Sequence, residues 1–344
     1  MPKNAKTAKL ERSPNYDFYV NVMGCCVPLL AMSCFYFGAR PALSALLGMA
    51  VAYLCDCIVT PLHSAGYRAH EPSSECFALL TVLMLPASVR YSVIVTAVIA
   101  AVVAKKAFGG EGHYPFNPTA VGLVVVGVSW PKEVFRYPEP GTMLPLWNTD
   151  GVALSESMGA TLTGGGLPTG STLNLLIGNV AGPMGAVCTL VIAACGVYLL
   201  ARGQLHLSTV LPFLLLVVLV PWLFPRLNEL PSFSLPWTYI RQRLYLEKYM
   251  LLSGGVLFGG IFLASEPVTQ PNRTSSRVIY GVALGILTVV FRYYSIYETG
   301  ICFALLMVNA FPEWLDRIGR RAERTRFMRK EEQRIAKQRK PESR

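Results

Sequence analysis

One stretch of the chain combines glycines, lysines and an asparagine in a way that suits ligand binding. It runs from Lys105 and Lys106 through Gly109 and Gly110 to Asn117. Adjacent glycines let a backbone approach a flat or phosphorylated ligand closely, and lysines can meet an anion. The same residues also suit a tight cytoplasmic turn flanked by lysines, and the spacing alone leaves both interpretations open.

Two further stretches carry hydroxyl groups and a carboxylate. Residues 148–163 are small and hydroxyl-rich, a composition typical of a flexible loop. Residues 252–269 place a glycine-rich helix before Ser265, Glu266 and Pro267. A predicted membrane segment therefore ends at a carboxylate and a proline.

Asp56 is the only acidic residue clearly inside a predicted membrane segment. A carboxylate at that depth costs at least about 2.5–3.5 kcal/mol, so it normally faces a cavity, an ion path or a partner. Asp56 is therefore a candidate for a proton or sodium path, and the alternative is an aspartate bonded to a neighbouring hydroxyl. Glu298, beside the last segment, is expected to be interfacial. The nine cysteines show no CxxC pair and no Cys/His zinc spacing, so we predict no metal site. We also predict no catalytic residue in this chain.

These residues must be positioned by membrane segments. Hydrophobic residues make up 53% of the 344 and charged residues only 15%, whereas soluble domains carry about 25% charged residues. The sequence predicts an all-α polytopic membrane protein with about ten transmembrane or half-spanning helices. The predicted segments are 18–38, 41–62, 76–90, 91–107, 117–131, 181–201, 206–224, 249–265, 277–295 and 299–312.

The order of the segments predicts an internal repeat. Five precede a long loop and five follow it, and the third and eighth are short or broken by proline or glycine. This is the pattern of an inverted 5+5 repeat, whose site lies near the midplane where broken segments meet. The predicted organisation is a basic N-terminus 1–17, a first repeat 18–131, a loop 132–180, a second repeat 181–312 and a basic tail 313–344.

Positive charge is concentrated at the two ends of the chain. The net charge is +11, and of the 31 Lys and Arg residues, four lie in residues 1–17 and twelve in residues 313–344. Next to membrane segments this predicts cytoplasmic termini and contact with anionic lipid headgroups. No aromatic or glycine-rich RNA motif accompanies the charge, so no nucleic-acid partner is predicted. Ten crossings then place the loop 132–180 outside the cytoplasm.

The motifs resemble those of the RnfD/NqrB family, membrane subunits of ion-translocating redox complexes. The stretch 106–118 is similar to the family's Lys-x-x-Phe-Gly-Gly-x-Gly-x-x-x-Phe-Asn-Pro motif. Residues 177–182 resemble the start of the helix after the flavin loop, and 253–255 resemble a Ser-Gly-Gly motif. Residues 264–269 resemble Ala-Thr-Asp-Pro-Val-Thr. The resemblance extends over about residues 14–317.

The resemblance implies a covalent flavin. It implies that FMN is joined by a phosphoester to Thr161, within Met158-Gly159-Ala160-Thr161, by a separate flavin transferase. Two departures from the family pattern are Ser155, where the motif has an aspartate, and Ser265-Glu266, which replaces Thr-Asp. Riboflavin, bound non-covalently, is implied as well, without assigned residues. The further cofactor-binding candidates are Gly159, Ala160, Lys106, Gly109, Gly110, Asn117 and Glu266.

The function that the resemblance implies is that of the D component of an Rnf-type complex in the bacterial inner (cytoplasmic) membrane. Such a complex passes electrons between ferredoxin and NAD while it moves Na⁺ or H⁺, and this chain has no complete activity alone. It lacks a dinucleotide-binding fingerprint and an iron–sulfur cysteine run, so the other subunits supply those functions. One alternative is the B subunit of a Na⁺-pumping NADH:quinone reductase, which typically has a longer N-terminal extension. The other is a flavin-free channel or transporter of urea-channel-like architecture.

Overall fold

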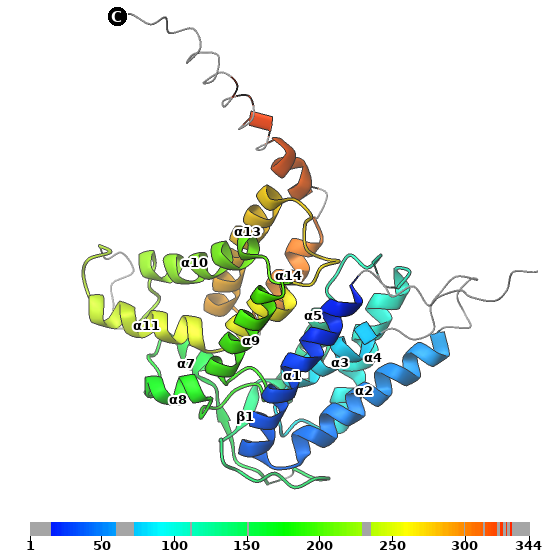
Figure 1. Cartoon of the computed structure of the whole chain (residues 1–344). Helices are drawn as coiled ribbons and strands as arrows, with labels where there is room; N and C mark the ends of the chain where they lie inside the picture. The colour runs from blue at the N-terminus through cyan, green and yellow to red at the C-terminus, as the bar shows by residue number, and fades with distance from the viewer. Residues whose placement is uncertain are drawn as a thin grey trace, which may run out of the picture.

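The computed structural model describes residues 15–59, 72–110, 112–149, 151–228, 235–298, 300–311, 314–321, 324–325, 328 and 331. The predicted basic extensions 1–17 and 313–344 lie largely outside these residues. Within them the chain is mostly helical, as the sequence predicts (Figure 1). The difference from an all-α expectation is one small antiparallel sheet in the long loop.

Each predicted membrane segment has a helical counterpart. The first five are α1 (Tyr16–Phe37), α2 (Arg40–Val59), α3 (Pro72–Leu83), α4 (Tyr91–Ala107) and α5 (Pro118–Ser129). The loop forms α6 (Pro131–Val134), β1 (Arg136–Pro138), β2 (Leu154–Glu156), α7 (Met158–Thr163) and α8 (Thr172–Ile177). The second five are α9 (Thr189–Ala201), α10 (Leu207–Leu223), α11 (Ile240–Leu252) with α12 (Val256–Phe258) and the π-helical turn η2 (Gly259–Leu263), α13 (Thr274–Tyr294) and α14 (Gly300–Asn309).

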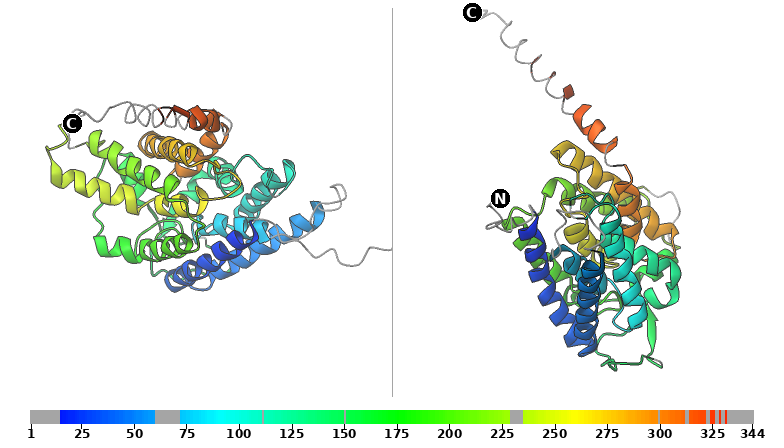
Figure 2. Two further views of the ribbon diagram at one scale, coloured as in Figure 1. Left: turned by 45° about the horizontal axis from the view of Figure 1, so that its top comes forward. Right: turned by 90° about the vertical axis from the view of Figure 1, so that its right-hand side faces the viewer.

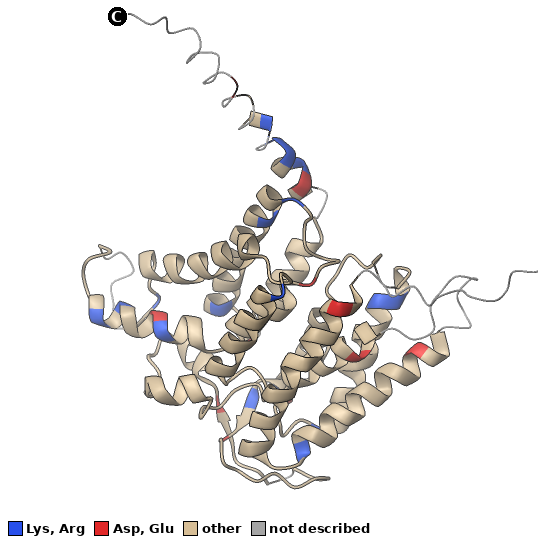
Figure 3. Ribbon diagram, viewed as in Figure 1, with Lys and Arg blue, Asp and Glu red and all other residues tan. Residues whose placement is uncertain are grey.

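The long helices are suited to a bilayer. Among the described residues, α1, α2 and α13 are each long and apolar enough to cross it. Helix α11 and the α12–η2 segment are long and apolar enough only when taken together, and they are bent by 53° where they meet, as in a broken span or a re-entrant loop. Large apolar side chains such as Leu46, Leu54 and Ile58 on α2 are exposed, and charged residues are sparse along the helices (Figure 3). A surface of this kind is stable in lipid rather than in water, so the chain is a multi-pass membrane protein.

Two predicted segments are shorter as helices than the sequence suggests. Helix α3 stops at Leu83 instead of continuing to residue 90, because Pro86 cannot donate to a helical ladder. The predicted segment 181–201 becomes helical only at Thr189. The two irregular stretches supply hydrogen-bond partners to each other's backbone, since the Met184 amide donates to the Leu85 carbonyl at 3.0 Å. Irregular backbone at membrane depth requires such internal partners.

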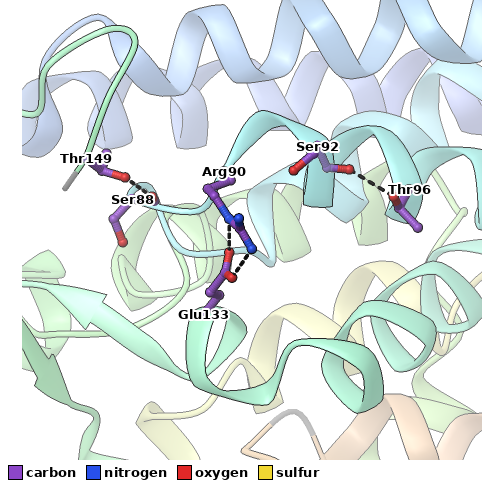
Figure 4. Close-up of polar contacts among 6 residues, drawn as sticks. All are labelled: Ser88, Arg90, Ser92, Thr96, Glu133 and Thr149. Atoms are coloured by element: carbon purple, nitrogen blue, oxygen red, sulfur yellow. Dashed lines mark hydrogen bonds and ion pairs between the residues drawn. The ribbon is translucent and has the colours of Figure 1, made fainter.

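The long loop closes one end of the helical body, and we call this end the loop face. The Leu144 amide donates to the carbonyl of Phe37, the last residue of α1, at 3.1 Å. Arg90, just before α4, pairs with Glu133 on α6 (Figure 4). The beginning of α1 and the helical segment after α14 lie toward the opposite end, the terminal face (Figure 2).

Glycines allow helices to approach each other closely. A Cβ atom at Gly281 on α13 would overlap the Thr209 carbonyl oxygen of α10. A Cβ atom at Gly122 on α5 would overlap the Ala97 carbonyl oxygen of α4. Small residues at such crossings let van der Waals packing hold helices together where lipid supplies no hydrophobic driving force.

We expect Gly281→Ala to destabilise the protein by about 1–3 kcal/mol, because the new methyl group meets rigid backbone rather than a flexible side chain. Thermal unfolding of the detergent-purified protein measures this. Gly24→Ala is the matched control, since Gly24 lies on α1 and a Cβ there meets nothing within 4 Å. Equal melting temperatures for the two variants would contradict the packing argument.

Candidate functional site

Thr161 lies on a short, well-defined helix rather than in a flexible loop. Ser157 caps α7, and its Oγ accepts the amides of Gly159 at 3.1 Å and Ala160 at 3.2 Å. A serine in this position satisfies amides that a helix would otherwise leave without partners. The Thr161 side chain is exposed, and its hydroxyl is 3.4 Å from the Ser157 carbonyl. The helix therefore presents Thr161 at the surface of the loop face.

Helix α7 is attached to the end of α13. The Thr163 hydroxyl lies 3.0 Å from the carbonyl of Arg292, in the last turn of α13. The glycine turn after α7 is held from the other side, where the Asn228 amide donates to the Gly165 carbonyl at 2.9 Å. These contacts fix α7 on the loop face, at the end of a membrane-spanning helix.

A cavity of about 510 Å³ adjoins α7 on the loop face. Its lining includes the apolar ring of Phe135, the cationic side chains of Lys132 and Arg136, and the carboxyl group of Glu298. Ser155 lies on β2 opposite Tyr137, and its hydroxyl donates to the Tyr137 carbonyl at 3.3 Å. The serine that departs from the family motif is thus part of the sheet that borders α7.

The sequence did not indicate how deeply Glu298 is placed. It was expected to be interfacial, but only 9% of its surface is exposed, and it contacts Gly159. Burial raises the pKa of the Glu298 carboxyl, and the facing Ser157 hydroxyl lowers it only in part. Burial and the nearby Glu298 also raise the pKa of Tyr137. Proximity in sequence gives no signal for this contact, since more than 130 residues separate the two sides.

The structure does not bring the first motif to Thr161. Helix α4 begins next to Arg90 on the loop face and has 17 residues. At about 1.5 Å per residue, Lys106 near its other end lies roughly 25 Å from the loop-face end of the helix. Gly109 and Gly110 follow with φ angles of 106° and 86°, and the Gly110 amide donates to the Lys105 carbonyl. The glycines therefore end α4 near the terminal face.

Lys106 and Asp56, which the sequence singled out separately, form one buried cluster. The Lys106 Nζ and Asp56 Oδ1 atoms are 3.1 Å apart. The Ser74 hydroxyl donates to the same oxygen at 3.1 Å, and Lys105 donates to Ser74 at 3.0 Å and to Ser73 at 2.5 Å. Two lysines and one aspartate thus share an almost fully buried site between α2, α3 and α4.

Glu266 and Asn117 meet where the two halves of the chain join. The Asn117 amide group donates to the Leu263 carbonyl at 3.1 Å, just before Glu266. The buried Glu266 carboxylate accepts the hydroxyls of Tyr114 at 2.7 Å and Tyr19 at 3.0 Å. Its other oxygen accepts the amide and the hydroxyl of Thr269, each at 2.8 Å. The sequence did not identify the tyrosines, although Tyr114 lies inside the glycine-rich motif.

Removing one partner of the buried ion pair should cost more than removing both. We expect Lys106→Met to destabilise the protein by about 3–5 kcal/mol, because it removes the ammonium group that lies 3.1 Å from the buried Asp56 carboxylate. The double variant Asp56→Asn/Lys106→Met should recover most of that loss. Thermal unfolding of the four proteins in the double-mutant cycle measures the coupling, and additive losses would contradict it.

These features define a helical multi-pass membrane protein with an exposed threonine on a short helix that contacts a buried carboxyl group on one face, and a buried Asp–Lys cluster near the other. The chain belongs to the NQR2, RnfD, RnfE family, whose model matches residues 12–324. It is 26% identical over 325 residues to the D component of an ion-translocating oxidoreductase complex from Cronobacter sakazakii, covering 84% of this chain and 89% of the relative. The D components of the same kind of complex from Erwinia tasmaniensis and Escherichia coli are 29% and 27% identical, over 84% and 86% of this chain and 88% and 90% of theirs.

Proposed function

We propose that the chain is the D component of an Rnf-type ion-translocating oxidoreductase complex and that it carries FMN on Thr161. The relatives above bear the name of this component of an ion-translocating oxidoreductase complex, which favours the assignment over the B subunit of a quinone reductase. The observation that carries the flavin proposal is the exposed hydroxyl of Thr161 on a capped helix.

The cavity beside α7, which is lined by Ala160, Thr163 and Gly164 of this segment rather than by Thr161, offers groups suited to a phosphorylated, planar ligand. Lys132 and Arg136 can meet a phosphate, and Phe135 offers an aromatic surface in the same cavity. A bound flavin supplies electron transfer, and the protein tunes its potential through hydrogen bonds, charge and burial. In this proposal the chain holds the cofactor on the loop face and the other subunits bring and remove electrons.

The same proposal includes the membrane topology. Both termini are cytoplasmic, the loop 132–180 faces outward, and the membrane is the bacterial inner membrane. The location of the loop face opposite the beginning of α1 supports this orientation (Figure 2). The short α3 and the bent α11–η2 span support an inverted 5+5 repeat, because broken helices in corresponding places are its hallmark.

In-gel ultraviolet fluorescence of the denatured chain tests the flavin proposal. After expression with the flavin transferase, we expect a fluorescent band for the wild type and none for Thr161→Ala. Thr169→Ala is the matched control, because Thr169 is an exposed threonine in the same loop, and it should stay fluorescent. A dark wild-type band would contradict covalent attachment and favour a flavin-free channel or transporter.

We further propose that Asp56 belongs to the ion path. Its carboxylate is 1% exposed and shares a site with Lys105 and Lys106, so a bound cation would compete with the lysine ammonium groups. Asp56→Asn should lower Na⁺ or H⁺ pumping per assembled complex at least tenfold, measured in proteoliposomes. The double variant Asp56→Asn/Lys106→Met, which we expect to be more stable than Lys106→Met, should show the same loss of pumping as Asp56→Asn. Wild-type pumping in both variants would exclude this role.

A further inference from the structure

The turn between α13 and α14 places one carboxyl group directly beneath α7. A Cβ atom added to Gly159 would lie 2.6 Å from Oε1 and 2.8 Å from Cγ of Glu298. Real Cβ atoms do not approach other atoms so closely, so a side chain at position 159 would displace the Glu298 carboxyl group from its present position. The first turn of α7 therefore rests on the Glu298 side chain.

The polar groups around this carboxyl come from the capped start of α7 and from β1. The hydroxyl of Ser157, the Gly159 amide and the hydroxyl of Tyr137 face it. Since Ser157 Oγ already accepts two amides of α7, its own hydrogen is available to Glu298. Within the described part of the chain, the buried Oε2 atom of Glu298 and the Tyr137 hydroxyl nevertheless have no hydrogen-bond partner in good geometry.

The Arg292 guanidinium favours the ionised form of Glu298 without pairing with it directly. The Arg292 guanidinium donates to Ser253 Oγ at 2.9 Å and to the Met250 carbonyl, and no salt bridge between Arg292 and Glu298 is formed among the described residues. The other charged groups that line the adjoining cavity are Lys132 on α6, Arg136 on β1 and Glu156 on β2.

We propose that Glu298 is a positioning residue for α7 and that its ionisation sets the local charge beside Thr161. The proposal deepens the proposed function where it concerns the flavin. A protonated Glu298 can donate a hydrogen bond and packs neutrally against Gly159. An ionised Glu298 places a negative charge, which Arg292 offsets only in part, under the helix that bears Thr161.

The pH dependence has a definite sign. Because burial raises the pKa of Glu298, the folded protein favours the protonated carboxyl. Its contribution to the stability of the α7 contact is complete below the ordinary carboxyl pKa and is lost as the pH rises through the folded-state pKa. Above that pH, the negative charge also opposes the addition of an electron to a group held at Thr161.

The first test is redox titration of the flavin in the purified complex over a pH series. We expect Glu298→Gln to keep in-gel fluorescence but to shift the midpoint potential to more positive values, only above the pH at which Glu298 ionises. Glu139→Gln is the matched control, because Glu139 is an exposed carboxylate in the same loop, and it should follow the wild type. Potentials for Glu298→Gln that match the wild type at every pH would overturn the proposal.

A second test is independent of the flavin. In the Thr161→Ala protein, amide hydrogen exchange across residues 157–166 should speed up with rising pH more than the intrinsic exchange rate does. Adding Glu298→Gln should remove this excess. If the wild type proves flavin-free while this difference appears, the flavin proposal fails and the role of Glu298 stands. An excess that is unchanged by Glu298→Gln would overturn that role as well.

Discussion

Backbone groups at a helix end inside an apolar medium must find their partners within the protein, and this constraint organises the whole structure. The Arg40 guanidinium satisfies four such carbonyls, those of Ala87 and Val89 after α3 and of Pro145 and Leu146 in the loop. One buried side chain thus ties a short membrane helix to the loop face. The cost of burying its charge is offset by these charge-assisted hydrogen bonds.

At the terminal face the same constraint is met by a carboxylate. Glu266 accepts two backbone amides of the turn that follows η2, at 3.2 Å and 2.8 Å. Its carboxylate therefore supplies the hydrogen-bond partners of the backbone where this helical segment ends. It also receives hydroxyls from Tyr19 on α1 and Tyr114 after α4. The first and second halves of the chain are therefore joined through the residue at which the second half is interrupted. Glu266 stands where the similar motif has an aspartate, and its carboxylate reaches both sets of donors.

The sequence predicted the helices better than it predicted their contacts. Apolar runs identify membrane segments because lipid exposure makes a helix apolar on all sides, and Pro86 correctly marked the short α3. The ion pair between Asp56 and Lys106 could not be predicted, because 50 residues separate its partners and no local pattern specifies a tertiary contact. Glu298 looked interfacial for the same reason, since only the folded loop buries it. The loop itself was read as flexible, because small hydroxyl-bearing residues serve equally well in turns and as helix caps.

The residues of the Thr161 motif divide into those that the fold requires and one that it does not. Ser157 caps α7, and Gly159 is needed because Glu298 occupies the space of a side chain. Thr163 connects α7 to α13 through the Arg292 carbonyl. Thr161 has only a 3.4 Å contact to the carbonyl of its own preceding turn and is exposed. Packing and capping account for Ser157, Gly159 and Thr163, and the exposed threonine beside them on the same helix is the group that the proposed flavin attachment would use.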